Sequence, residues 1–219
     1  ARVARLANAA EAAAVRDATM PLAVTGIVVV LVLLAAGVRF RHRLWPQLRR
    51  ALPVVAYAAL GVVPASFLVG QIGPVRATLP AQTVIVAALA GVLAYAADRV
   101  ERRRTGAGVL VAVGAIVALV AADIVMGAPL QLNTTFGYSV AVAGRFSGLG
   151  NLAFALFGAA TILLAVLIVD RSGPRGVRVA LVLMAAVLMV EGLPMLGADV
   201  GGVLSMVPAF GVTALILLG

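Results

Sequence analysis

The chain has 219 residues, of which 63% are hydrophobic and only 11% are charged, and its mean hydropathy is +1.15. Soluble domains are closer to half apolar and a quarter charged, so this composition excludes an ordinary soluble enzyme and any disordered or fibrous protein. It indicates a polytopic membrane protein. The chain has no Cys and a single His, His42, which excludes disulfides and a Cys/His zinc site and argues against a Ser-His-Asp triad.

Seven apolar runs are long enough to cross a bilayer, which takes about 20 mostly apolar residues. Backbone that faces lipid must satisfy its own hydrogen bonds, and no barrel-type alternation is present, so these runs predict helices. The predicted fold is therefore an all-α polytopic membrane protein with about seven transmembrane helices. The predicted spans are 20–38, 51–69, 80–97, 108–126, 151–169, 177–193 and 203–218.

The basic residues predict the orientation of the chain in the membrane. The net charge of +9 would suggest nucleic-acid binding in a soluble protein, but here it indicates topology, and no nucleic-acid partner is expected. Twelve of the 17 basic residues, all of them Arg, lie in the connections after the first, third and fifth spans. The positive-inside rule makes these connections cytoplasmic, where contact with anionic lipid is their other role. The N-terminus and the loops at 70–79, 127–150 and 194–202 are then extracytoplasmic.

Residues 1–18 are Ala-rich, with Arg and acidic residues interspersed, and predict an extracytoplasmic juxtamembrane helix. A segment placed outside without a preceding signal predicts an upstream extracytoplasmic domain that is missing from this sequence. The alternative is a short surface helix on a small protein. Residues 19–219 form the predicted transmembrane domain.

The Gly-rich turn near the end of the 127–150 loop is the first candidate site. Gly148 and Gly150 permit close backbone approach, and Asn151 occupies the expected N-cap of the next helix. A helix N-terminus beside Arg145 offers donors suited to a phosphate or carboxylate. This pattern predicts an anion or lipid-headgroup site at the outer membrane surface. The alternative is a tight turn with packing glycines and an Arg that reaches the membrane interface.

Three carboxylates are expected on the same outer face, from their positions in the predicted topology. Acidic residues near a bilayer are costly unless they are paired or hydrated, so each of them should have a partner or a function. Their alternative roles are ion-pair partners of Arg145, ligands of a divalent cation, a general base, or simple stabilisation of the loops. These acidic residues are Asp123, Glu191 and Asp199, and the neutral side chains Gln131 and Asn133 add hydrogen-bonding groups to the same face.

The stretches GRFSGLGNLAFALFGAA and GLPMLGADVGG resemble the membrane part of uncharacterised polytopic proteins of high-GC Gram-positive bacteria, the actinobacterial group. In those proteins an extracytoplasmic alkaline-phosphatase-like domain precedes the membrane helices, and RVARLANAAEAAAVRDA resembles the junction after that domain. The resemblance implies a larger protein of the cell envelope that acts on phosphate- or sulfate-containing groups. It supplies no catalytic residue for this chain.

The sequence therefore predicts a multi-pass protein of the cell membrane that presents an anionic lipid, such as a polyprenyl phosphate, at the outer leaflet. The lipid would serve an extracytoplasmic phosphatase- or transferase-like domain. The alternatives are a lipid transporter or flippase component and a structural accessory subunit of a membrane complex. Whether this chain is itself catalytic stays open.

Overall fold

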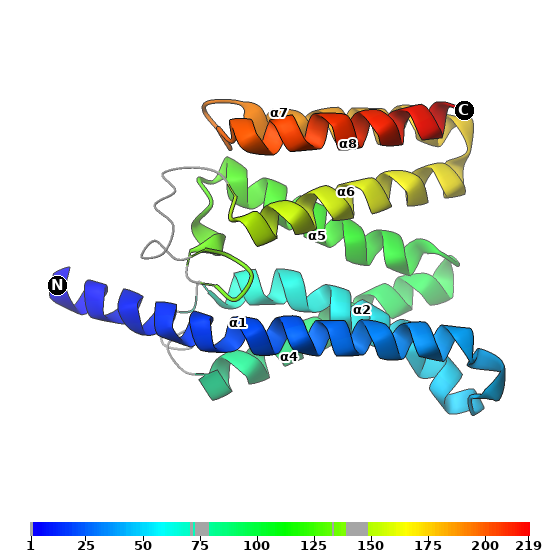
Figure 1. Ribbon diagram of the computed structural model, residues 1–219. Coiled ribbons are helices and arrows are strands. Elements are labelled where there is room, and N and C mark those ends of the chain that lie inside the picture. The colour runs from blue at the N-terminus through cyan, green and yellow to red at the C-terminus, as the bar shows by residue number, and fades with distance from the viewer. Residues whose placement is uncertain (1, 71, 73–78, 133, 139–148) are drawn as a thin grey trace.

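The computed structural model describes residues 2–70, 72, 79–132, 134–138 and 149–219. This part of the chain is all-α and contains seven long helices, arranged side by side with short connections at the two ends of the bundle (Figure 1). Two short 3₁₀ helices, η1 (Arg41–Arg43) and η2 (Pro129–Gln131), lie in connections. The long helices are α1 (Arg2–Arg39), α2 (Pro46–Val69), α4 (Leu79–Arg103), α5 (Ala107–Val125), α6 (Asn151–Ser172), α7 (Pro174–Gly192) and α8 (Val200–Leu218).

All seven predicted spans are confirmed as helices, and six of these are long and apolar enough to cross a membrane. The remaining helix, α7, carries Arg175, Arg178 and Glu191, and by composition alone these three charges exclude it from the candidate membrane spans. These charges lie near its two ends, and residues 179–190 between them are uncharged. Because α6 ends and α8 begins at opposite ends of the bundle, α7 must run back along its full length (Figure 1).

Several helices extend beyond the predicted spans at the end of the bundle that carries the Arg-rich connections. α2 begins at Pro46 rather than at 51, and α4 continues to Arg103 rather than to 97. The charged residues end the apolar runs but not the helices, because an Arg side chain keeps its head in water while its stem lies along apolar surface. The opposite end, which holds the N-terminus, is named the outer end below, after the orientation predicted from the arginines (Figure 1).

Helix packing depends on small residues at the places where backbones approach closely. α2 and α4 cross at Gly61, where an added Cβ would lie 3.1 Å from the backbone oxygen of Ala90. This is the behaviour expected of membrane helices, whose association depends on close contact rather than on exclusion of water. The buried core lies mainly between α2, α5, α6, α7 and α8 and includes Phe67, Val113, Val120, Phe157, Met184, Met206 and Phe210.

The first helix is long and lies at the edge of the bundle. α1 has 38 residues, about 57 Å at 1.5 Å per residue, whereas the hydrocarbon core of a bilayer is about 30 Å thick. Residues 2–18 of the predicted juxtamembrane segment and the first span therefore lie in one continuous helix, without a break at residue 18. Most side chains of the apolar half of α1 are exposed, and many of these face the surrounding lipid in a membrane.

Candidate functional site

A buried carboxylate organises the chain after α5. Asp123 is only 2% exposed, and its two oxygens accept hydrogen bonds from the backbone N–H of Leu130 at 2.7 Å and from Nε2 of Gln131 at 2.8 Å. Gln131 is itself fully buried, and its Oε1 accepts from the N–H of Gly150 at 3.2 Å. This chain of bonds joins the end of α5 to the start of α6. A buried polar group that is fully hydrogen-bonded in this way fixes one loop conformation.

The described loop residues after η2, 132 and 134–138, fold back over the outer end of α2 and are called the loop below. The backbone oxygen of Gln131 accepts from the Thr134 hydroxyl at 3.2 Å and from the Tyr138 N–H at 3.1 Å. Residue 137 is Gly because an added Cβ would collide with the backbone oxygen of Gln131. A Cβ at Gly70, the residue after α2, would likewise collide with the methyl group of Thr134. Glycine at position 137 therefore allows the loop to fold tightly on itself, and glycine at position 70 allows the loop to lie against the end of α2.

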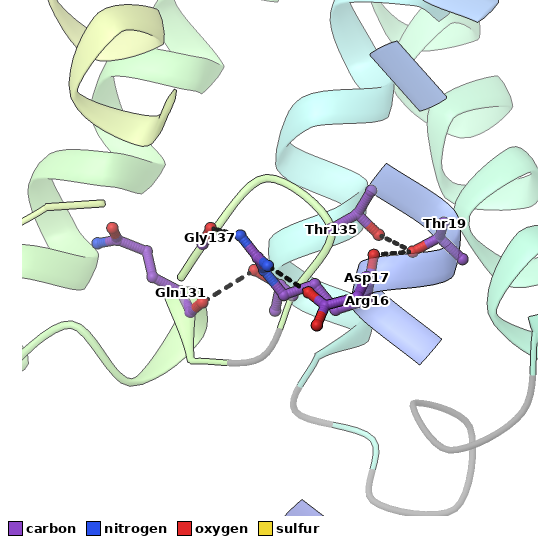
Figure 2. A network of polar contacts seen from close by, with 7 residues as sticks. Arg16, Asp17, Thr19, Gln131, Thr135 and Gly137 are labelled. Atoms are coloured by element: carbon purple, nitrogen blue, oxygen red, sulfur yellow. Dashed lines mark hydrogen bonds and ion pairs between the residues drawn. The ribbon is translucent and has the colours of Figure 1, made fainter. Parts of the chain in front are cut away.

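Polar side chains attach this loop to two helices that are far from it in the sequence. From α1, Arg16 donates to the backbone oxygen of Gly137 at 3.0 Å and pairs with Asp17 at 2.7 Å (Figure 2). One turn further along α1, the Thr19 hydroxyl lies 3.5 Å from that of Thr135 (Figure 2). From α4, Nε2 of Gln82 donates to the same Thr135 hydroxyl at 3.1 Å. The loop thus joins α1 and α4 at the outer end.

A cavity of about 450 Å³ lies beneath this polar network, between α1, α2, α4 and the loop. Its size falls in the range of about 300–1,000 Å³ that is usual for small-molecule sites. Its walls are mostly apolar, and one of them, Leu22, is 67% exposed, so the cavity reaches the surface that faces lipid. The lining residues are Thr19, Leu22, Ala23, Val62, Ser66, Gln82, Thr83, Val86, Ala87, Thr135 and Phe136.

The two remaining predicted acidic residues meet at the outer ends of α7 and α8. Asp199 caps α8, because its Oδ1 accepts from the N–H of Gly202 at 2.9 Å, and its own N–H donates to the backbone oxygen of Glu191 at 3.1 Å. The Glu191 side chain is fully buried close to the same turn, since a Cβ at Gly202 would lie 2.9 Å from its Oε1. A role for these two residues together with Asp123 on one outer face stays a prediction.

The structure does not gather all three carboxylates into a cation site. Among the described residues, no group of three His, Cys, Asp or Glu side chains is placed to hold a metal ion. Asp123 binds neutral donors of its own loop, whereas Glu191 lies in the last turn of α7 and Asp199 caps α8. A divalent cation shared by these three residues therefore has no support in the described part of the chain.

The Gly-rich turn itself lies largely outside the described residues. Arg145 and Gly148 of this turn, and Asn133 earlier in the chain, lie outside the described residues. The expected approach of Arg145 to a carboxylate or anion therefore stays a prediction. Gly150 and Asn151 are described, and the cap differs from the expectation by one residue. Gly150 occupies the N-cap and Asn151 is the first residue of α6. Glycine is an accepted N-cap residue, although it lacks the side-chain oxygen that Asn would supply.

Sequence reasoning missed the residues that line or border the cavity. Thr19 and Gln82 lie near the outer ends of the first and third spans, and Thr135 lies in the loop. A polar residue at a membrane boundary is common, so each of them alone predicts nothing specific. Their meeting depends on contacts between segments 53 and 116 residues apart, and no local pattern contains that information.

Comparison with protein-family models, with curated proteins and with solved structures gives no match for this chain. The described helices define it as a multi-pass helical membrane protein. At its outer end, the described loop residues 134–138 lie over a largely apolar cavity.

Proposed function

We propose that this protein is a lipid-binding membrane module that holds an anionic amphipath at the outer leaflet. The cavity between α1, α2, α4 and the loop carries the proposal, because it is apolar and reaches the lipid-facing surface. A hydrocarbon chain gains about 0.8 kcal/mol for each CH₂ removed from water, but little on moving from lipid into an apolar cavity. Selectivity must therefore come from polar groups near the headgroup.

Arg16 supplies the charge for this headgroup. It lies one helical turn outward from Thr19, which lines the cavity, and its guanidinium remains cationic in any protein environment. Two of its nitrogens are used by Asp17 and Gly137, and its buried Nε has no acceptor among the described residues. An Arg at a membrane boundary is well suited to a phosphate because its donors are planar and fixed. The Gly-rich turn with Arg145 would add donors on the same face.

In this proposal the bound lipid is presented to an extracytoplasmic phosphatase- or transferase-like domain in cell-envelope metabolism. The support for that domain is the resemblance of RVARLANAAEAAAVRDA to a domain junction. The anchoring of the loop to α1 supports the same arrangement, because α1 extends beyond the bilayer thickness at the outer end. A domain attached there would lie directly above the cavity.

Lipid binding by the purified full chain tests the proposal. The probes are dioleoyl phosphatidic acid and uncharged dioleoylglycerol, measured by native mass spectrometry from detergent. Ala23→Trp fills the cavity and should weaken both probes about ten-fold, whereas Val24→Trp, on the neighbouring 38% exposed position, should not. Arg16→Gln should weaken phosphatidic acid about five-fold and leave dioleoylglycerol unchanged, and Arg39→Gln at the opposite end of α1 is its control.

Unchanged binding in Ala23→Trp would contradict the proposal. Absence of any lipid binding would favour the structural-subunit alternative. Movement of a fluorescent lipid across proteoliposomes, faster than in protein-free vesicles, would favour the flippase alternative.

A further inference from the structure

The amide of Gln82 stands out in the cavity because its hydrogen bonding is incomplete. Gln82 is the fourth residue of α4, lines the cavity and is only 5% exposed. Its Nε2 donates to Thr135, but its buried Oε1 has no hydrogen-bond donor among the described residues. Buried polar atoms are nearly always partnered, so an exception inside a cavity points to a missing ligand.

The directions of the neighbouring hydrogen bonds show which group the ligand must offer. The Thr19 hydroxyl donates to the backbone oxygen of Arg16 at 3.0 Å, so its contact with Thr135 must be donated by Thr135. Thr135 in turn accepts from Nε2 of Gln82. One N–H of the Gln82 amide and both threonine hydroxyls are therefore used, and the carbonyl of Gln82 is the acceptor that is left over.

The opposite orientation of the Gln82 amide satisfies fewer bonds. Thr135 would then have to donate to the Gln82 carbonyl, and its contact with Thr19 would have no proton, because the Thr19 hydroxyl already donates to Arg16. The orientation with a free carbonyl is thus the better one.

A further polar wall of the cavity has the same character. The Ser66 hydroxyl is buried and donates to the backbone oxygen of Val63 at 2.7 Å. Thr19, Ser66 and Thr135 have thus all committed their protons and present only oxygen lone pairs, and Gln82 adds its unpartnered carbonyl and the second N–H of its amide. A phosphate or carboxylate finds no hydroxyl donor here and would meet the Gln82 carbonyl as a second acceptor, and an ammonium ion would lose its hydration among apolar walls. A neutral hydroxyl or amide N–H suits them.

We infer that the cavity selects an amphipath by a hydroxyl or amide N–H donor placed between its headgroup and its hydrocarbon chain, with Gln82 as the acceptor. This inference rests on the proposed lipid-binding function and names the ligand class. The headgroup lies outward near Arg16, the donor meets Gln82, and the chain follows Leu22, Val62 and Val86. The terminal torsion of a Gln side chain is soft, so a small rotation of the amide turns Oε1 toward the donor.

Two probes that differ in one hydroxyl test this inference on the purified full chain. They are 1-oleoyl-glycerol-3-phosphate, whose free 2-hydroxyl lies between phosphate and chain, and its 2-deoxy analogue. We expect the native protein to bind the hydroxylated probe about ten-fold more tightly. Gln82→Met keeps the length of the side chain without the carbonyl and should reduce the preference to less than two-fold, whereas Gln47→Met, exposed at the other end of the bundle, should preserve it.

A second variant separates recognition from loop anchoring. Thr135→Val removes the partner of Gln82 Nε2 but keeps the Gln82 carbonyl, so the preference should survive even if the stability falls. Equal affinity of the native protein for the two probes, or an undiminished preference in Gln82→Met, would overturn the inference and leave lipid binding intact. Failure of the native protein to bind either probe would instead overturn the proposed function as well.

Discussion

At the scale of single residues, Asp123 holds the outer chain together through neutral donors. Its two oxygens accept hydrogen bonds from η2, and the amide of Gln131 in turn accepts from the residue before α6, so every acceptor in this chain of bonds meets a donor. A donor in place of one Asp123 oxygen would leave one of these bonds unmade. The carboxylate is therefore a structural requirement of the loop that covers the cavity.

Asp123→Asn should lower the stability of the protein by about 1–3 kcal/mol, the usual cost of leaving a buried hydrogen-bonding group unmatched. The NH₂ group of the Asn amide would face either the N–H of Leu130 or Nε2 of Gln131, and two donors cannot form a hydrogen bond with each other. If the Gln131 amide turned over to compensate, the N–H of Gly150 would lose its acceptor. Thermal unfolding in detergent measures the effect. Asp170→Asn, an exposed exchange of the same two residues, is the control, and equal stabilities of the two variants would refute the argument.

At the scale of the helices, the contact between α2 and α4 forms one wall of the cavity and depends on Gly61. Gly61→Leu should destabilise the protein by about 1–3 kcal/mol, because a larger side chain forces apart two backbones that cannot yield locally. The Cβ alone would lie 3.2 Å from the Cα of Ala90 and 3.3 Å from the Cβ of Leu93. Gly91→Leu on α4 is the matched control, since no atom lies within 4 Å of its added Cβ. Thermal unfolding and yield of folded protein in detergent should separate the two variants, because Leu favours a helix over Gly at both positions and only Gly61 lies against a neighbouring backbone. Similar losses of stability in both variants would refute the packing argument.

The helices could be predicted because long apolar runs in a membrane protein have one economical backbone conformation. The position of α6 follows from the residues after Asn151 alone, and the Gly-rich turn before it marked its start to within one residue. The cavity could not be predicted, because Thr19, Gln82 and Thr135 lie in three segments that are distant in the sequence and come into contact only in the folded protein. The role of Asp123 was open for a related reason. A carboxylate that satisfies its own loop and one that binds a ligand have the same appearance in a sequence.

At the scale of the whole molecule, the three Arg-rich connections lie together at one end of the bundle and predict its orientation (Figure 1). The native chain has no Cys, so each introduced thiol is unique. Thr105→Cys, in the exposed α4–α5 turn, should react with a membrane-impermeant maleimide only after the cells are opened. Met195→Cys, at an 83% exposed position between α7 and α8, should react in intact cells. Labelling of residue 105 in intact cells would reverse the topology and place the cavity in the inner leaflet.

The bond between Thr19 and Thr135 also sets an order of assembly during synthesis. The two residues are 116 positions apart, which at about 5–20 residues per second means that α1 is made roughly 6–23 s before its partner in the loop. During that interval the loop residues that border the cavity beside α1 and α2 have not yet been made. If the proposed function holds, a lipid molecule can enter from the side before the loop arrives, and the newly made protein would finish folding around it.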